Sequence, residues 1–345
     1  YTDGFGLPDD FARRIAKNTQ IVLRDECNLT DVIDPAAGSY FVEALTAEIA
    51  QKAWALFTDV ESRGGYLAAI KEGFIQSAVK ATAAAKVKAL ASRKDVMVGS
   101  NKYSNLTEKA PNFVAFCTKD VAEKRRKAIK DFVGKRDEAK AQSALGELAK
   151  SAKADTRDVF ERATVAYLAG ATIAEVEASA VYVTEKTPIA PVEPIAKALA
   201  FEQLRARADE YRTKNGELPK VFLSNMGTVA QFKGRQDFSM DFMKVAGFEC
   251  IENFGFPTPA EAAKAFAESG AKATVICSTD DNYELVVPEL AGLIKKASPG
   301  ARIILAGYPT EKIDEYKAAG VDEFIHVKAN VVEVLSRLQS DMKIA

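Results

Sequence analysis

The feature that most constrains the fold is an alternation of short apolar runs with helical patterns, which occurs five times between residues 218 and 345. The runs begin at Val221, Cys250, Ala273, Ile303 and Phe324, and the helical patterns that follow them span residues 238–246, 259–269, 283–297, 311–319 and 331–342. Strands that alternate with helices of this length predict right-handed βαβ units and a parallel sheet covered on both faces. We therefore predict an α/β fold in which residues 217–345 form a flavodoxin-like, doubly wound parallel sheet with strand order 2-1-3-4-5.

The residues before this sheet are expected to be mainly helical. Helical patterns cover residues 9–25, 68–93, much of 118–182, and 194–213, and three prolines between 187 and 194 predict an extended tether. Residues 119–153 hold 11 Lys or Arg and 6 Asp or Glu, a net charge of +5. Such mixed charge predicts a solvated face, with a partner-docking surface as the alternative. Trp54 lies on the apolar stripe of another helix, which predicts a core position.

Composition excludes several classes of function. The net charge of −1 provides no field that would steer the chain onto nucleic acid or an anionic membrane. No apolar run reaches the roughly 18 residues of a membrane span. The four cysteines are far apart and form no CxxC pair, a pattern that favours a reducing, cytoplasmic location. With His326 as the single histidine, a three-histidine zinc site cannot be built.

In an open parallel sheet, ligands bind beyond the carboxyl ends of the strands. The glycine-containing segment 224–235 follows the first strand, where an anion site or a plain connection are both possible. Asp280 and Asp281 follow the third strand, and they could bind a metal or, more simply, cap a helix. His326 is interpreted as a surface or packing residue rather than a base. Cys277 is interpreted as a small buried hydrophobe.

Three segments resemble the end of the catalytic barrel of the methylmalonyl-CoA mutase family: LPDDFARRIAKNTQ (7–20), DPAAGSYFVE (34–43) and GSNKY (99–103). The last domain is similar to the cobalamin domain of the same enzymes. In that family the barrel holds acyl-CoA, the flavodoxin-like domain holds adenosylcobalamin, and a helical linker joins them. The resemblance therefore implies the closing part of a (β/α)8 barrel over residues 1–103, a helical linker over 104–216 and a degenerate cobalamin-binding domain over 217–345.

The departures from the family pattern are informative. The family motif Asp-x-His-x-x-Gly, whose His ligates cobalt and whose Asp orients that His, here has Val229, Gln231 and Gly234. The family's Ser-x-Leu, which accommodates the nucleotide tail of the cofactor, has Cys277 and Thr279 as its outer residues, and its Gly-Gly has become Ala306 and Gly307. Glutamine cannot act as an imidazole ligand. We therefore expect no catalytic, cofactor-binding or metal-binding residue on this chain.

This loss of all three signatures resembles the small, non-catalytic subunit of the heterodimeric enzymes in that family. The resemblance then implies that adenosylcobalamin is bound by a catalytic large subunit, the partner of this chain. The alternatives are a catalytic acyl-CoA mutase that binds cobalamin without a His ligand, and a regulatory or interaction module. An acidic residue that lies near the cofactor in the family corresponds to Asp3, to which no role is assigned. A complete barrel needs about 250 residues, so we expect either a longer protein or stabilisation by a partner.

Overall fold

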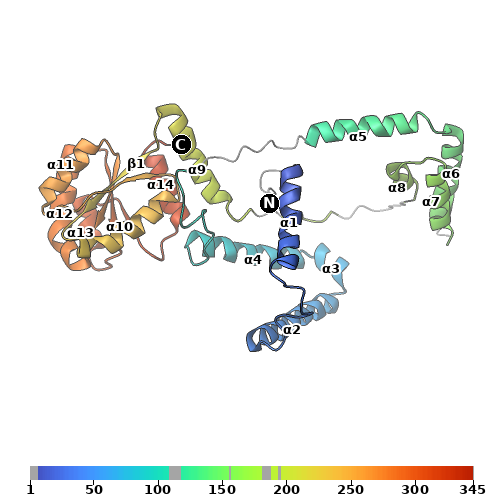
Figure 1. Cartoon of the computed structure of the whole chain (residues 1–345), viewed down its shortest axis with the longest axis horizontal. Helices are drawn as coiled ribbons and strands as arrows, with labels where there is room; N and C mark the ends of the chain where they lie inside the picture. Colours follow the sequence, from blue (N-terminus) through green and yellow to red (C-terminus); the bar gives the residue numbers. More distant parts are fainter. Residues whose placement is uncertain (1–6, 109–117, 155–156, 181–187, 193–195, 345) are drawn as a thin grey trace. The chain divides into compact units, whose positions relative to one another are not determined.

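The computed structural model describes residues 7–108, 118–154, 157–180, 188–192 and 196–344 (Figure 1). The chain divides into two compact units. One unit combines Tyr1–Glu72 with Ala110–Ile189, and the other combines Gly73–Lys109 with Ala190–Ala345. Asp3 and Cys117 lie outside the described residues, and the predicted tether is described only at residues 188–192.

The second unit contains a five-stranded parallel sheet with the order β2-β1-β3-β4-β5. Its strands are β1 (Lys220–Asn225), β2 (Glu249–Ile251), β3 (Ala273–Cys277), β4 (Arg302–Ala306) and β5 (Glu323–Ile325). Every residue of the central strand β3 is buried, as expected of a parallel strand covered on both faces. The predicted α/β class and strand order are confirmed.

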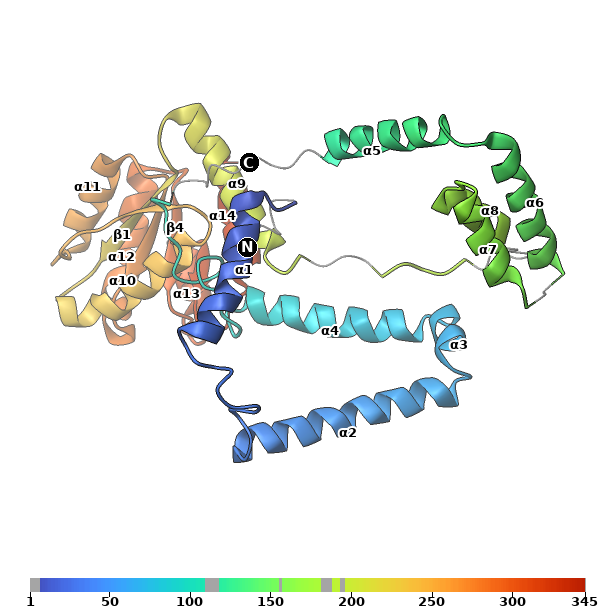
Figure 2. The same ribbon diagram turned by 45° about the vertical axis from the view of Figure 1, so that its right-hand side comes forward.

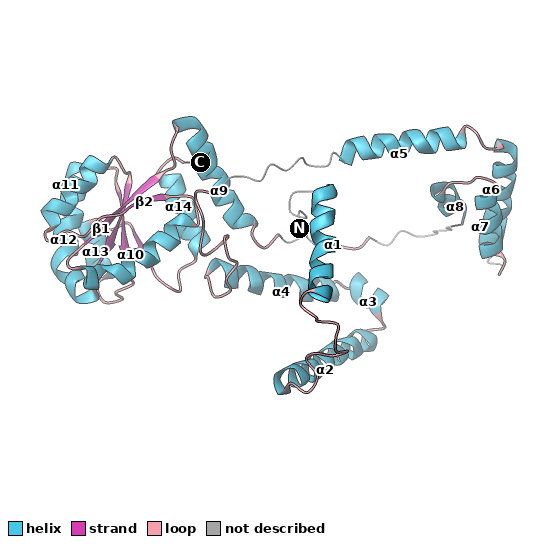
Figure 3. Ribbon diagram, in the orientation of Figure 1, coloured by secondary structure: helices cyan, strands magenta, loops and turns pink. Residues whose placement is uncertain are grey.

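Helices cover both faces of this sheet (Figure 3). One face packs against α9 (Leu199–Asn215), α10 (Val229–Lys244) and α14 (Val331–Asp341), and the other packs against α11 (Pro259–Ser269), α12 (Asp280–Ala297) and α13 (Ile313–Ala319). The first core includes Phe242 and Leu335, and the second includes Phe266 and Leu290. The sheet is therefore the centre of two separate apolar cores.

Two helices of this unit begin earlier than predicted. Helix α10 begins at Val229 rather than at residue 238, because the backbone of Thr228 is extended and its N–H is capped by the Gln231 side chain. The segment predicted to be a loop is therefore largely helical. Helix α12 begins at Asp280, with Thr279 at the N-cap position. Asp280 and Asp281 thus lie in the first turn, where their negative charges interact favourably with the helix dipole. They do not occupy the N-cap position itself.

The helix predicted over residues 68–93 is broken in two. Helix α3 (Tyr66–Lys71) ends before Gly73, whose φ of 78° is left-handed, and α4 (Phe74–Ala91) follows it. The turn after α4 is fixed to the sheet unit. Asn101 is fully buried and donates to the Leu90 carbonyl at 3.0 Å. The backbone N–H of Tyr103 donates to Asp241 of α10 at 2.9 Å.

The first unit begins with α1 (Asp10–Asp25) and α2 (Tyr40–Ser62). No residue of α2 is buried. The prediction that Trp54 belongs to the core is wrong: 66% of the residue is exposed, and its ring stacks on Phe57 at 5.3 Å. The apolar stripe of α2 is real, but no apolar surface covers it among the residues that the structure describes. Between residues 7 and 108 the structure shows no strand of a barrel.

Where the structure describes residues 118–180, they form four helices: α5 (Thr118–Val133), α6 (Glu138–Lys153), α7 (Val159–Leu168) and α8 (Ile173–Ala180). Helices α6, α7 and α8 lie together (Figure 2) around a small core that includes Leu148 and Ala166. Arg136, which lies just before α6, links this helix to α8, because its guanidinium donates to both carboxylate oxygens of Glu175 at 2.7 Å. No helix among the described residues has the length and apolarity that crossing a membrane requires.

Candidate functional site

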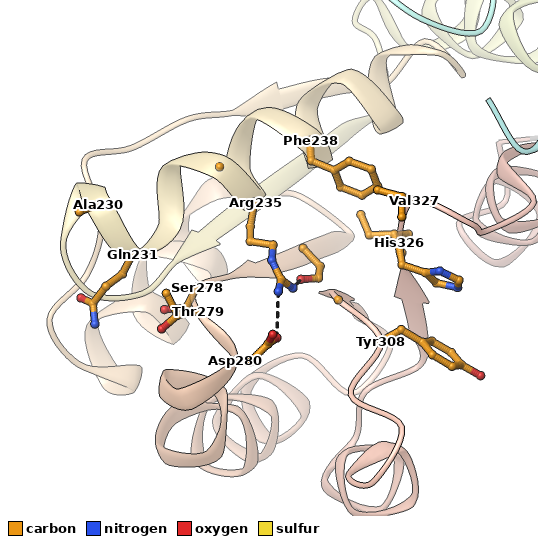
Figure 4. Close-up of a pocket in the computed structure, with 14 residues that line it drawn as sticks. Ala230, Gln231, Arg235, Phe238, Ser278, Thr279, Asp280, Tyr308, His326 and Val327 are labelled. Carbon is orange, nitrogen blue, oxygen red and sulfur yellow. Dashed lines mark hydrogen bonds and ion pairs between the residues drawn. The ribbon is translucent and has the colours of Figure 1, made fainter. Parts of the chain in front are cut away.

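A pocket of about 590 Å³ lies at the carboxyl ends of the strands, where the α/β topology predicts a ligand site (Figure 4). It brings together five of the seven motif positions: the changed residues Gln231, Thr279 and Ala306, and the retained glycines Gly234 and Gly307. The other two do not line it. Val229 is 55% exposed at the start of α10, and Cys277 is completely buried within β3.

Arg235 lies at the centre of this pocket, and the sequence analysis did not single it out. Its Nη2 atom lies 2.9 Å from Oδ1 of Asp280 on α12, and its Nη1 atom donates to the Ala306 carbonyl at the end of β4. The guanidinium also lies 5.5 Å from the centre of the Tyr283 ring. Arg235 therefore connects α10 with α12 and with β4 across the pocket (Figure 4).

Gly307 leaves the space that the guanidinium of Arg235 occupies. A Cβ atom at Gly307 would collide with Nη1 of Arg235, and it would also contact the Tyr283 ring at 3.5 Å. Glycine thus permits the present position of the guanidinium, whose end would have to move if a Cβ atom were added.

Gln231 has a local structural role. Its Oε1 atom accepts hydrogen bonds from the backbone N–H of Thr228 at 2.8 Å and from the Thr228 hydroxyl at 3.0 Å. The same oxygen closely approaches Gly227, which has a left-handed φ of 88° and no room for a Cβ atom. The amide therefore completes the first turn of α10.

Two buried groups lie behind residues that line the pocket, and neither is chemically activated. Burial raises the pKa of the Cys277 thiol to about 12, and its Sγ atom lies 3.5 Å from the Ser239 hydroxyl. The Tyr283 hydroxyl donates to the Ala306 carbonyl at 2.8 Å, and burial raises its pKa as well. Both groups are neutral at physiological pH. The interpretation of Cys277 as a small buried side chain is confirmed.

His326 lines the pocket from the end of β5, and Figure 4 shows it on the opposite side from Gln231. Its ring centre lies 4.6 Å from that of Tyr308, and its Nδ1 atom accepts from the backbone N–H of Lys328 at 3.3 Å. Burial and the charge of Lys328 lower the pKa of His326 below 6.5. The histidine is therefore a neutral packing residue.

The predicted alternatives at this edge can be compared with the geometry. Asp280 forms an ion pair with Arg235, so its carboxylate already has a cation as its partner. Across the described part of the chain, no three His, Cys, Asp or Glu side chains are grouped so that they could hold a metal ion. What the arrangement provides is an open pocket with a fixed internal ion pair and an aromatic and apolar wall that includes Phe238 and Tyr308.

Comparison with known proteins gives a consistent result. The family model for methylmalonyl-CoA mutase matches residues 1–186. The chain is 30% identical over 327 residues to a methylmalonyl-CoA mutase small subunit of Porphyromonas gingivalis, covering 95% of this chain and 42% of that protein. It is 29% identical over 338 residues to a methylmalonyl-CoA mutase of Cereibacter sphaeroides, with coverages of 95% and 47%. It is 26% identical over 328 residues to the large subunit of the Porphyromonas enzyme, with coverages of 92% and 46%. The chain thus spans less than half the length of these relatives.

Proposed function

The chain belongs to the methylmalonyl-CoA mutase family, and from this premise we propose that it is the C-terminal part of a small, non-catalytic subunit of that enzyme. The complex interconverts methylmalonyl-CoA and succinyl-CoA by rearranging the carbon skeleton. Adenosylcobalamin supplies the radical chemistry, and it is bound by the catalytic large subunit. The role of this chain is to stabilise that partner. A cytoplasmic location fits the free thiols of Cys27, Cys250 and Cys277.

The observation that carries the proposal is the residue type and hydrogen bonding at position 231. At the position of the family's cobalt-ligating His, an amide oxygen is held by the backbone and hydroxyl of Thr228. A carboxamide has no nitrogen lone pair comparable to that of imidazole, so it cannot replace the ligand. Val229 cannot provide the carboxylate that would orient a histidine either, because its side chain is apolar.

The rest of the pocket does not fit cobalamin either. The space beside Gly307 is filled by the guanidinium of Arg235, which is held by Asp280 and by the Ala306 carbonyl. His326, the single histidine, belongs to the opposite wall and packs on Tyr308. These residues supply no cobalt ligand at the expected place, and the guanidinium of Arg235 narrows the pocket beside Gly307. We derive no reaction step on this chain.

The domain assignment is part of the same proposal. Residues 217–345 are a flavodoxin-like domain of the cobalamin-binding type, residues 104–216 are a linker, and residues 1–103 belong to the closing part of a barrel. The sheet order supports the first assignment. The exposed apolar stripe of α2 supports the last, because such a stripe is typical of a helix that packs against other elements of a larger structure.

The similar proteins include a large subunit and a methylmalonyl-CoA mutase named without a subunit, so similarity alone does not distinguish the proposed role from that of a catalytic mutase. Cofactor binding does distinguish them. The purified chain is mixed with hydroxocobalamin, passed over a gel-filtration column and examined for visible absorbance that elutes with the protein. We expect none, whereas a His-containing large subunit treated in parallel retains the cofactor. Stoichiometric binding by this chain would contradict the proposal.

A second measurement tests the partner. The chain is co-expressed with a mutase large subunit that contains the complete Asp-x-His-x-x-Gly motif. We expect the two to co-purify, with one cobalamin per pair bound through the large subunit. Failure of the two chains to associate would favour the alternative of a separate regulatory or interaction module.

A further inference from the structure

We propose that Arg235 is an internal block of the pocket, so that restoring the cobalt ligand alone would not restore cobalamin binding. This inference rests on the proposed function and adds a second, independent reason for the absence of the cofactor. The first reason is chemical, since Gln231 is not a ligand. The second is steric and electrostatic, since a charged side chain projects into the pocket beside the segment that, in the family, accommodates the nucleotide tail of the cofactor.

The position of the block follows from the residues around it. In the family, the segment after the third strand accommodates the nucleotide tail, and here Ser278, Thr279 and Asp280 of that segment line the pocket. Arg235 enters the pocket from α10 and forms its ion pair with Asp280 at 2.9 Å. Its guanidinium therefore lies directly against the segment that the tail would have to contact (Figure 4).

The guanidinium also occupies the space beside Gly307. Gly307 gives no side chain to the pocket, which in an empty site would leave a cavity beside the end of β4. Nη1 of Arg235 lies so close to Gly307 that a Cβ atom there would require the end of the arginine side chain to move. A ligand group that enters there must first displace the arginine.

Displacement is opposed by several contacts at once. The guanidinium has a carboxylate partner in Asp280, a carbonyl partner in Ala306 and an aromatic face in Tyr283. Only 30% of the arginine side chain is exposed, so water does not fully replace these partners when they are lost. All three belong to regular elements of the sheet unit, two to α12 and one to β4. The block is thus fixed by the fold itself.

The test removes the two obstacles to cobalamin binding one at a time. The first variant, Val229→Asp with Gln231→His, restores the ligand motif, and the second adds Arg235→Ala to these two changes. Each is titrated with hydroxocobalamin and with cobinamide, which has the corrin ring but no nucleotide tail. Binding is measured by equilibrium dialysis and by the visible absorbance of the corrin. We expect the variant without Arg235 to bind hydroxocobalamin at least about tenfold more tightly than the variant that keeps it.

Cobinamide provides the matched comparison. Because it lacks the tail, we expect removal of Arg235 to change its affinity less than about twofold. The control substitution is Arg212→Ala, which removes an exposed arginine from α9 that pairs with Asp209 and leaves the pocket intact. Circular dichroism confirms that each variant is folded. If Arg235→Ala prevents folding, Asp280→Asn is used in its place. We then expect the affinity for hydroxocobalamin to increase as well, but by a smaller factor.

The outcomes distinguish this inference from the proposed function. If the unmodified chain binds hydroxocobalamin stoichiometrically, the proposed function fails. If the unmodified chain does not bind it, but the variant with the restored motif binds equally well with and without Arg235, only the block is contradicted. An equal gain for cobinamide and hydroxocobalamin would also contradict it, because the effect would not depend on the tail.

Discussion

Large apolar side chains are buried around the sheet but exposed on helix α2. Around the sheet, large side chains such as Leu223 and Phe242 are completely buried. On α2, 93% of Tyr40, 74% of Phe41 and 66% of Trp54 are exposed. Both regions carry apolar patterns that are typical of buried elements. The sheet unit satisfies its pattern within the described chain, whereas α2 presents a surface that fits the proposed barrel and its partner.

The largest expected difference between the two regions is in thiol reactivity. Cys27, in the turn after α1, is exposed, whereas Cys277 is completely buried and its pKa is raised to about 12. Modification of Cys277 needs the sheet unit to open, so we expect Cys27 to react at least about 1,000-fold faster. The rates are measured at pH 8 with iodoacetamide, using mass spectrometry of the peptides. Equal rates in guanidinium chloride serve as the control, and rates within tenfold in the native chain would contradict the comparison.

The next largest difference concerns the loss of an aromatic side chain. Phe242→Ala removes a fully buried ring from the core of the sheet unit, so we expect the free energy of unfolding to fall by about 3–5 kcal/mol. Trp54→Ala removes an exposed ring from α2, and we expect a change within about 0.5 kcal/mol. Urea unfolding followed by circular dichroism measures both. A loss of more than about 2 kcal/mol for Trp54→Ala in the isolated chain would mean that α2 is covered after all.

The smallest effect on stability is expected for the ion pair between Arg136 and Glu175 in the α6–α8 group of helices. Hydrogen bonds from Arg136 and Thr172 lower the pKa of the Glu175 carboxyl from 4.5 to about 2. Its contribution is therefore complete above pH 4.5 and is lost as the pH falls towards 2. We expect acid to unfold α6–α8 over this range, and we expect Glu175→Gln to weaken that dependence on pH. Circular dichroism of the helices between pH 6 and pH 2 measures it.

The control for this experiment is Glu147→Gln. Glu147 also has a lowered pKa, but it belongs to an exposed pair with Lys150 on the surface of α6. Exposed pairs contribute little to stability, so we expect this substitution to leave the acid transition nearly unchanged. An equal effect of both substitutions would contradict a special role for Glu175.

The sequence predicted the sheet unit better than the helices before it. Apolar runs such as the one from Ala273 to Cys277 have one plausible structure between helical patterns, and the handedness of βαβ units restricts the strand order. The start of α10 was misplaced, because the cap depends on the backbone of Thr228 and on one glutamine rather than on apolar spacing. The position of Trp54 was misjudged, because an apolar stripe predicts that a helix will be covered but does not supply the covering surface.

The candidate site was predicted in part. The seven positions of the family motifs could be named from the sequence, and five of them line one pocket, three of which carry a changed residue. Arg235 could not be recognised, because its partners Asp280 and Ala306 lie on other elements. Periodicity describes which face of a helix is buried, but it does not specify what a long side chain meets across the end of a sheet.

The sequence by itself determined that no imidazole stands at position 231, and folding cannot change that chemistry. It also determined the order of the strands, because local patterns and chain chirality leave few alternatives. Only the tertiary structure decided that the pocket beside Gly307 holds the guanidinium of Arg235. The physical reason is that this contact joins α10, α12 and the end of β4, which are distant in sequence and meet only when the sheet has formed.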